Sequence, residues 1–480
     1  MEISRAEPEV ARVTTSTGVR PGSTSQSHNR QMRFKRRTAA SDTMAIVAVV
    51  SIAIAVALFL ATGGPRQFGT VAASVTSLGI IAGLIGTDLV LIMLVLAARI
   101  PFIDHTVGND RAMALHRKLG KPALYLLLGH GVVLLIGYAL AAKVDPVAEV
   151  GAMWALPDLP LAFVALGLFL VVVVTSVVAV RRRFPYEFWH VIHLLSYFAV
   201  LFALPHELSE GGVLAEGSAE RVYWIALYVV AFGAIAVFRF GEPLVKSLRH
   251  DIRVAAIEVV GPNVVSLHLS GRHLESLRSS GGQFFIWRFW TGKTWWHSHP
   301  ISMSSIPTGS EVRITVRALG NGSTRLGMLP VGTRVWIEGP YGLFTDAART
   351  APKLAIVAAG IGITPVRALL EDSRLAPDEA TIMLRASSES DRYLWDEMQQ
   401  LADRSGAALY TAVGARPAGV DTWLSERDLA RGVSLRSAFP DLLVSDLYVC
   451  GPQSWTDLVV EDARAAGLPA HQIHTERFDW

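Results

Sequence analysis

The chain contains almost no cysteine: Cys450 is the only one among 480 residues. No intrachain disulfide can form. An iron–sulfur cluster needs several protein ligands, usually four cysteine thiolates, so a plant-type ferredoxin domain is excluded. Charged residues are also scarce, at 18% of the chain, and the net charge of +3 gives no reason to expect a nucleic-acid partner.

Apolar residues, in contrast, make up 51% of the chain and gather in its first half. Residues 1–43 are rich in Ser, Thr and Arg, and we interpret them as a disordered, basic cytoplasmic tail. A six-helix transmembrane domain is predicted over 44–240, because the apolar stretches there are long enough to cross a bilayer. These stretches are 44–62, 72–98, 120–141, 159–180, 187–206 and 221–240.

The loops between these stretches alternate in charge. Arginine and lysine follow the second, fourth and sixth stretches, whereas the other loops carry little positive charge and several acidic residues. The positive-inside rule then predicts a multi-pass plasma-membrane protein with both termini in the cytoplasm. The acidic residues assigned to the outer side are Asp145, Glu149, Asp158, Glu207, Glu210, Glu216 and Glu220.

Four histidines are paired within the apolar half. His116 and His130 are 14 residues apart, and His193 and His206 are 13 apart. At about 1.5 Å per residue each pair spans roughly 20 Å, which fits within a hydrocarbon core of about 30 Å. Neutral imidazole is a common axial ligand of haem iron. The spacing therefore predicts two stacked haems held between two helices.

The helical angle between His193 and His206 disagrees with this interpretation. A 14-residue step returns to within roughly 40° of the same helix face, but a 13-residue step misses it by roughly 140°. Pro205 is expected to rotate or unwind the turn that carries His206. His190 competes with His193 as the inner ligand, and we favour His193 because its depth matches that of His116.

The second half of the chain has a different pattern. Short β-type runs such as "IRVAAIEVV" and "VRITVRAL" predict an antiparallel β-barrel over 250–348. Strands then alternate with helices over 352–480, which predicts an α/β domain with a parallel nucleotide-binding sheet. The predicted fold is thus a membrane all-α bundle, a β-barrel and a parallel-sheet domain.

Two glycine motifs lie at predicted strand ends. "AAGIGITP" places Gly360 and Gly362 before a helix, where the backbone can approach a pyrophosphate. Thr364 and Pro365 begin that helix. "YVCGP" ends a later strand with Cys450, Gly451 and Pro452. Either motif alone also suits an ordinary tight turn.

Two further motifs suit a flavin. In "HPISMSS" the hydroxyl of Ser302 can hydrogen-bond a flavin ring nitrogen, and His299 can meet a phosphate. "GNGSTRL" offers Gly322 and Ser323 as a second phosphate cradle, although a solvated turn explains them equally well.

With these motifs in this order, residues 45–480 resemble the flavocytochromes of the NADPH oxidase and ferric reductase superfamily. The resemblance implies a six-helix di-haem domain joined to a ferredoxin-reductase-like FAD and NAD(P) module. It implies histidine pairs at 14 and 13 spacing on the third and fifth helices, and Ser302 facing the flavin N5. The motifs similar to those of the family are His299-Pro300-Ile301-Ser302, Gly282-Gln283-Phe284, "EGPYG" at 338–342, the segment 358–365 and the segment 450–452.

The chain departs from the family in two places. Ile301 stands where the family usually stacks an aromatic ring on the flavin, which implies weaker stacking. The chain ends in "HTERFDW", so either Phe478 or Trp480 is expected to cover the flavin. The resemblance implies Ser302, Cys450 and Trp480 as the catalytic residues.

Two arginines bear on the choice of nucleotide. Arg385 and Arg416 are placed at the ends of the second and third parallel strands, where loops reach the adenosine ribose. A guanidinium pairs well with a 2′-phosphate, which favours NADPH over NADH. Two solvated arginines are the alternative.

The sequence thus predicts an NAD(P)H-dependent transmembrane oxidoreductase with FAD, two b-type haems and no iron–sulfur cluster. Electrons would leave on the outer face to dioxygen or ferric iron. Two alternatives remain at this point. The chain would feed an exported partner protein, or it would be a haem-free, membrane-tethered flavin reductase acting in the cytoplasm.

Overall fold

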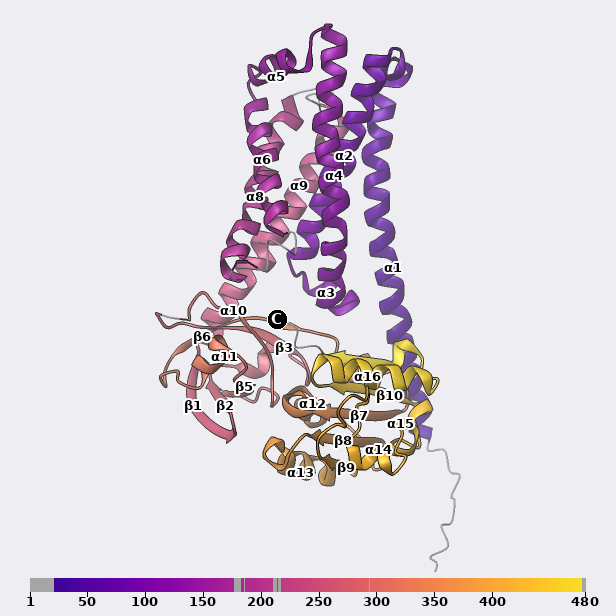
Figure 1. Cartoon of the computed structure of the whole chain (residues 1–480), viewed down its shortest axis with the longest axis vertical. Coiled ribbons are helices and arrows are strands. Elements are labelled where there is room, and N and C mark those ends of the chain that lie inside the picture. Colours follow the sequence, from indigo (N-terminus) through magenta and orange to yellow (C-terminus); the bar gives the residue numbers. More distant parts are fainter. Residues whose placement is uncertain are drawn as a thin grey trace, which may run out of the picture.

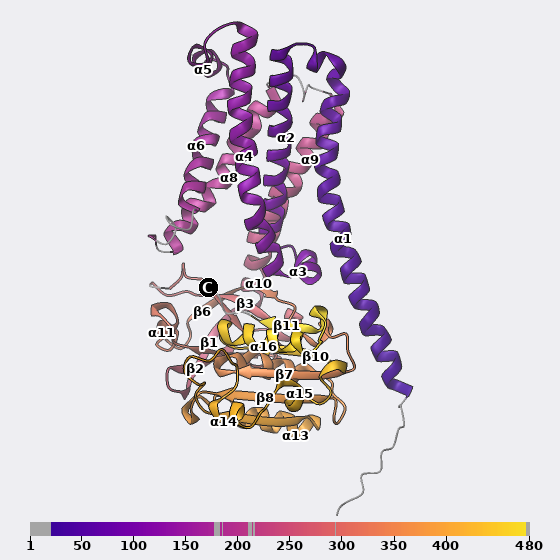
Figure 2. The ribbon, with the colours of Figure 1, turned by 45° about the vertical axis from the view of Figure 1, so that its right-hand side comes forward.

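The computed structural model describes residues 21–176, 183–184, 186–209, 214, 217–292 and 294–476. Long helices gather in a bundle, and two sheets lie together at one end of it (Figure 1; Figure 2). Helix α1 runs along the bundle and continues beyond it, beside the parallel sheet, in both views.

Among the described residues, six helical segments are long and apolar enough to cross a membrane, as predicted. The long helices are α1 (Pro21–Gly63), α2 (Val71–Ala97), α4 (Asn109–Ala142), α6 (Leu159–Ser176), α8 (Tyr186–Ser209) and α9 (Ala219–Ala234). Two short helices, α3 (Pro101–Val107) and α5 (Pro146–Trp154), connect them.

Helices α2 and α4 pack very closely because α2 presents glycines to α4. A Cβ atom on Gly79 would lie 2.9 Å from the side chain of Leu134, and one on Gly86 would lie 3.0 Å from Leu127. Small residues let membrane helices approach until their backbones are nearly in contact. This contact places the carbonyl groups of α2 within reach of side chains on α4.

The bundle continues directly into the antiparallel sheet. Helix α9 passes into the π-helical turn η2 (Ile235–Gly241) and then α10 (Glu242–His250), which precedes β1. Lys246 Nζ donates to the carbonyl of Gly339 at 2.6 Å, and Ser247 Oγ accepts from Ile337 N at 3.0 Å. These bonds attach α10 to strand β6.

The antiparallel sheet has the order β4-β3-β6-β1-β2-β5. A bridge between Met303 and Ile314 joins its two edges at one point, as expected for a barrel-like sheet. Its core contains the fully buried Phe285, Trp287 and Phe289. The strands are β1 (Ile252–Gly261), β2 (Val264–Ser270), β3 (Phe284–Phe289), β4 (His299–Ser302), β5 (Glu311–Arg317) and β6 (Arg334–Tyr341), and the short helix α11 (Asn321–Leu326) follows β5.

The second sheet is parallel throughout, with the order β11-β10-β7-β8-β9. Separate hydrophobic cores cover its two faces, as the alternation of strands and helices predicted. Its strands are β7 (Lys353–Ala359), β8 (Ala380–Ala386), β9 (Ala408–Val413), β10 (Ser445–Cys450) and β11 (Ile473–Glu476). Its helices are α12 (Ile363–Asp372), α13 (Trp395–Ser405), α14 (Glu426–Ala430), α15 (Leu435–Ala438) and α16 (Gln453–Ala465).

The prediction of a disordered tail over 1–43 is wrong from Pro21 onward, where α1 begins. Residues before it lie outside the described part of the chain. Arg30 is only 7% exposed: it donates to the carbonyl of Ala351 at 3.2 Å and pairs with Glu379 at 3.2 Å. Composition indicated disorder because these partners are more than 300 residues away and become available only in the folded protein.

Candidate cofactor sites in the bundle and the two sheets

The four paired histidines meet across α4 and α8. The ring centroids of His116 and His193 are 6.1 Å apart, and those of His130 and His206 are 6.5 Å apart. A metal ion bonded to two opposed imidazole nitrogens at about 2 Å each would hold the ring centroids about 6 Å apart. Both pairs therefore have the separation that suits a bis-histidine haem.

Hydrogen bonds orient the two rings on α4. Nδ1 of His116 lies 3.1 Å from the carbonyl oxygen of Met93, and Nδ1 of His130 lies 2.9 Å from that of Gly79. A neutral imidazole that donates from Nδ1 to a carbonyl keeps the lone pair of Nε2 for a metal. The ring orientation thus fits axial ligation.

Helix α8 brings both of its histidines to α4 despite their 13-residue spacing. Pro205 lies inside the helix, immediately before His206. Trp189 stacks on His193, with centroids 5.1 Å apart, and His193 rather than His190 meets His116. The preference for His193 agrees with this geometry.

A cavity of about 850 Å³ opens beside the outer pair, with His130 and His206 in its wall. Leucine, valine, alanine and phenylalanine side chains form most of the lining, which suits a large, mainly apolar ligand. Glu207 was predicted on the outer loops, but it belongs to α8 and lines this cavity. Its carboxylate accepts from Tyr228 Oη at 2.9 Å.

The predicted flavin residues come together on the antiparallel sheet. Ser302, the last residue of β4, is 2% exposed and pairs with Phe284 of β3, which in turn pairs with Tyr341 of β6. The buried Gln283 accepts from Ser280 N at 2.8 Å through Oε1. Its Nε2 donates to Gly342 O at 3.2 Å, so Gln283 connects the turn before β3 to the loop after β6.

The two predicted phosphate motifs are neighbours. A Cβ atom on Gly322 would lie 3.5 Å from Cε1 of His299. Nε2 of His299 is buried and has no hydrogen-bond partner among the described residues. Burial, followed by His297 and Arg288, lowers the pKa of His299 to about 4. A buried imidazole with a vacant nitrogen beside a glycine turn suits an anionic ligand.

Three other motif residues already have contacts within the chain. Ser323 Oγ accepts from the backbone nitrogens of Leu319 and Gly320 at 2.9 and 3.1 Å, so it closes its own turn. Pro300 and Ile301 pair with β3, and Ile301 packs against the core of the sheet.

The glycine motifs of the parallel sheet also meet. A Cβ atom on Gly362 would lie 2.3 Å from the carbonyl oxygen of Cys450, so no larger residue fits there. Gly360 has φ +55°, a left-handed conformation that favours glycine. Thr364 Oγ1 donates to Ile361 O at 3.1 Å, and Pro365 lies in the first turn of α12. The segments 358–365 and 450–452 therefore form one surface.

Cys450 is fully buried, and burial raises the pKa of its thiol well above the usual value. A thiol in this environment is not ionised at neutral pH and is a poor nucleophile. Any role of Cys450 in catalysis is therefore one of contact and shape.

Glu476, which the sequence did not predict as a site residue, lies beside Cys450. It ends β11 and pairs with Cys450 across the sheet, and its Oε2 would lie 3.7 Å from a Cβ atom on Gly342. Burial raises the pKa of its carboxyl well above the usual value, which favours the protonated acid, and a protonated carboxyl can donate a hydrogen bond. The sequence signal that could have identified Glu476 is the acidic residue within the segment "HTERFDW". Phe478 and Trp480 lie outside the described residues.

The two arginines predicted to bind the nucleotide differ in position and in exposure. Arg385 lies within β8, not after it, and is 5% exposed. Its Nη1 donates to the carbonyl of Ala386, and burial lowers the pKa of its guanidinium. Arg416 follows β9 and is exposed. The prediction of two loop arginines is thus wrong for Arg385, because strand β8 extends one residue beyond it.

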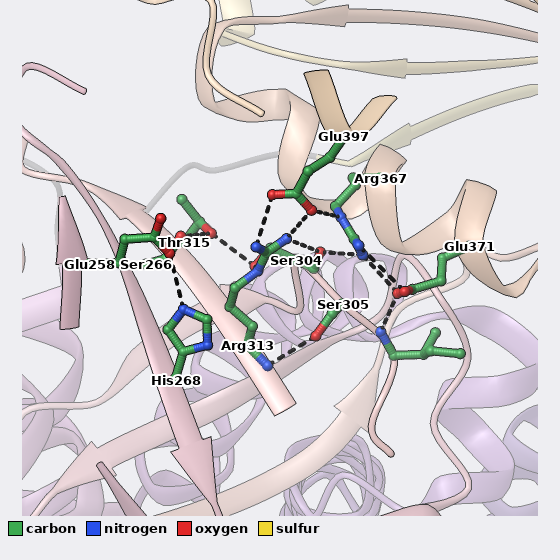
Figure 3. Close-up of polar contacts among 11 residues, drawn as sticks. Glu258, Ser266, His268, Ser304, Ser305, Arg313, Thr315, Arg367, Glu371 and Glu397 are labelled. Carbon is green, nitrogen blue, oxygen red and sulfur yellow. Dashed lines mark hydrogen bonds and ion pairs between the residues drawn. The ribbon is translucent and has the colours of Figure 1, made fainter. Parts of the chain in front are cut away.

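An ion-pair network joins the two sheet domains (Figure 3). Arg313 of β5 makes two bonds to Glu397 of α13, at 2.9 and 2.7 Å. Arg367 of α12 also bonds Glu397, at 2.6 Å, and Glu371, at 2.7 Å. Bidentate arginine–carboxylate pairs fix orientation as well as distance, so this network holds the sheets in one arrangement.

Comparison with known proteins supports the same division of the chain. The family description "Ferric reductase like transmembrane component" matches residues 82–204, and "FAD-binding domain" matches 249–345. Ferredoxin–NADP reductase B of Sorangium cellulosum is 33% identical over 193 residues, which cover 37% of this chain and 77% of that protein.

Two further proteins are similar to parts of the chain. A probable metalloreductase of Yarrowia lipolytica is 25% identical over 258 residues, covering 53% of this chain and 44% of that protein. The FAD/NAD-binding domain of the Vibrio cholerae nitric oxide dioxygenase is 22% identical, with a TM-score of 0.40, and covers 48% of this chain and 99% of that structure.

The matches to a ferric reductase-like membrane domain and an FAD-binding domain follow one another in the order of the helical bundle and the sheets. The reductase relatives supply the activity class. The chain therefore belongs to the superfamily that joins a ferric reductase-like transmembrane domain to a ferredoxin–NADP reductase-type FAD and NAD(P) module, and it is a membrane NAD(P)H-dependent oxidoreductase.

Proposed function

We propose that the protein moves electrons from cytoplasmic NAD(P)H, through FAD and two b-type haems, to dioxygen or ferric iron on the outer face. The observation that carries the proposal is the pair of imidazole contacts between α4 and α8, at 6.1 and 6.5 Å. His116 and His193 would hold the inner haem, and His130 and His206 the outer one. The carbonyls of Met93 and Gly79 orient the α4 ligands.

FAD, when bound, accepts a hydride from the nicotinamide and releases its electrons singly. The hydroxyl of Ser302 would donate to the flavin ring nitrogen at the end of β4. The buried carboxyl of Glu476 and the buried thiol of Cys450 would contact the nicotinamide side, with Trp480 as the proposed flavin cover. The other proposed flavin contacts are Gln283, Phe284, His299, Pro300, Ile301, Gly322 and Ser323.

The nucleotide would bind across the carboxyl ends of β7 and β10, where the two glycine motifs meet. Parallel sheets bind nucleotides at this edge, where helix α12 also begins. The exposed Arg416 is the proposed partner of the 2′-phosphate, which favours NADPH over NADH. The other proposed contacts are Gly360, Gly362, Thr364, Pro365, Arg385, Gly451 and Pro452.

The same proposal includes a topology in the plasma membrane. Both sheets would lie in the cytoplasm with both chain termini. The proposed domain limits are 44–240 for the di-haem domain, 250–348 for the FAD domain and 352–480 for the NAD(P) domain. The loop charges support this orientation, and so does the docking of Arg30 of α1 on the NAD(P) domain.

The similarity to a probable metalloreductase of Yarrowia lipolytica supports ferric iron as the acceptor. Oxygen remains an equal candidate, because electrons can leave a six-coordinate haem through its edge without a free iron site.

The test is anaerobic reduction of the purified protein by NADPH, followed by separate additions of oxygen and a ferric chelate. Two low-spin haems per chain should be reduced and then reoxidised by at least one acceptor. His116→Ala or His193→Ala should remove one haem, whereas the matched variant His190→Ala should retain both. A ratio near one haem per chain, or unchanged spectra in the ligand variants, would contradict the proposal.

A further inference from the structure

Glu338 of β6 lies where the helical bundle meets the antiparallel sheet, and three arginines surround it. Arg99, which follows α2, donates to Oε1 at 2.7 Å, and Arg239 of η2 donates to the same oxygen. Arg288 of β3 lies 3.5 Å from Oε2. We call these four residues, with Tyr341, the junction cluster.

The junction cluster carries more positive than negative charge. Burial by itself would raise the pKa of Glu338, but Arg99, Arg239 and Arg288 outweigh it and bring the pKa to about 2. The carboxylate is therefore ionised at neutral pH, and arginine does not lose its proton in proteins. Three guanidinium groups face one carboxylate that is only 2% exposed, which leaves a surplus of two positive charges.

One side of the junction cluster faces the inner histidine pair. Met93 of α2, whose carbonyl oxygen lies 3.1 Å from Nδ1 of His116, precedes Arg99 by six residues, which is about 9 Å at the rise of a helix. The charge of Arg99 also acts on His190, which lies one turn before His193 on α8. The surplus charge is therefore next to the proposed inner haem.

The other side leads to the flavin residues. Tyr341 Oη donates to Glu338 Oε1 at 3.2 Å. Tyr341 pairs with Phe284, and Phe284 pairs with Ser302. The junction cluster thus lies between the two ends of the step in which one electron leaves the flavin and enters the haem.

We propose that the junction cluster sets the reduction potential of the inner haem, because its two surplus positive charges stabilise the added electron. This inference rests on the proposed function. A unit charge about 10 Å away, at an effective dielectric of about 20, changes a one-electron equilibrium by about tenfold. The corresponding shift in potential is about 59 mV.

The sign of the shift separates this role from a purely structural one. Glu338→Gln raises the surplus from two charges to three, whereas Arg288→Gln lowers it to one. Glu338→Gln should raise the midpoint potential of the inner haem and Arg288→Gln should lower it. Each shift should be about 59 mV, which is a tenfold change in the one-electron equilibrium. Arg288→Lys preserves the charge and should leave the potential unchanged. Damage to the fold would shift the midpoint potential of the inner haem in the same direction in Glu338→Gln and Arg288→Gln.

The experiment is a potentiometric titration of haem absorbance in the purified, full-length protein. The inner haem is identified as the wave that disappears in His116→Ala. The outer haem lies roughly 20 Å further along α4, at 14 residues and about 1.5 Å per residue, so its wave serves as an internal control. Arg288 makes the longest contact and is 30% exposed, so its two variants test the idea even if Glu338→Gln fails to fold.

Opposite shifts of the inner wave for Glu338→Gln and Arg288→Gln, with Arg288→Lys unchanged, support the inference. Shifts of equal sign, no shift with Arg288→Gln, or an equal shift of both waves overturn it while leaving the proposed function intact. Absence of any haem wave in the wild-type protein overturns the proposed function and this inference together.

Discussion

A Cβ atom on Gly83 of α2 would lie 2.4 Å from Nδ1 of His130 on α4. One turn away on α2, the carbonyl of Gly79 lies 2.9 Å from the same nitrogen. Because α2 presents a glycine to the ring and a carbonyl to its Nδ1, it determines the orientation of His130. This relationship explains why the close packing of α2 and α4 matters for the outer histidine pair.

Gly83→Ala should therefore displace the imidazole of His130 and weaken its bond to Gly79. We expect loss of most of the outer haem, with the inner haem and FAD retained. Haem content and the low-spin absorbance per chain measure this. Gly129→Ala is the matched control, because a Cβ atom there meets no atom of the described residues within 4 Å. Full haem content in Gly83→Ala would refute the proposed role of α2.

Ser302→Ala should slow flavin reduction by NADPH by about tenfold to a hundredfold, because a hydrogen-bond donor to the reacting ring is lost. The haem spectrum should not change, since the serine lies on the sheet and not in the bundle. Stopped-flow absorbance of the flavin measures the rate. Ser305→Ala, whose hydroxyl accepts from Arg313 N at 3.1 Å, is the control. Equal rates in Ser302→Ala and the wild type would exclude a flavin contact.

Arg416→Ala should raise KM for NADPH by roughly tenfold to a hundredfold and leave KM for NADH almost unchanged, because a charge-assisted bond contributes about 1.5–3 kcal/mol. Steady-state kinetics with both nucleotides measure the difference. The exposed Arg431 at the end of α14 supplies the control, Arg431→Ala. Equal effects on both nucleotides would show that Arg416 does not read the 2′-phosphate.

We expect His299 to make FAD binding depend on pH. Its pKa without ligand is about 4, below the ordinary value of 6.5, so the folded apo protein binds fewer protons than the unfolded chain between these values. Its contribution to stability is therefore complete above pH 6.5 and is lost as pH falls towards 4. A phosphate beside Nε2 would reverse this by raising the pKa.

FAD binding should accordingly take up a proton near pH 6, and affinity should increase as pH falls from 7.5 to 6. Calorimetric titration of the apo-protein in two buffers of different ionisation enthalpy measures the uptake. His299→Gln should abolish it. Proton uptake of the same size in the variant would assign it to another group.

Patterns within short segments of the sequence were sufficient to predict the fold. Apolar length predicted the membrane-crossing helices, and alternation along the strands predicted the antiparallel and parallel sheets. These features depend on the burial of nearby side chains, so they can be read from neighbouring positions alone. The order of the motifs was likewise sufficient to identify the superfamily.

Only the tertiary structure decided which distant residues meet. It paired His206 with His130 in spite of an unfavourable helical angle, and it placed Glu476 beside Cys450. It also buried Arg30 of a predicted disordered tail against the nucleotide domain, and Glu338 among arginines from two domains. A buried charge requires a partner from another element, and no local pattern specifies which element will lie there.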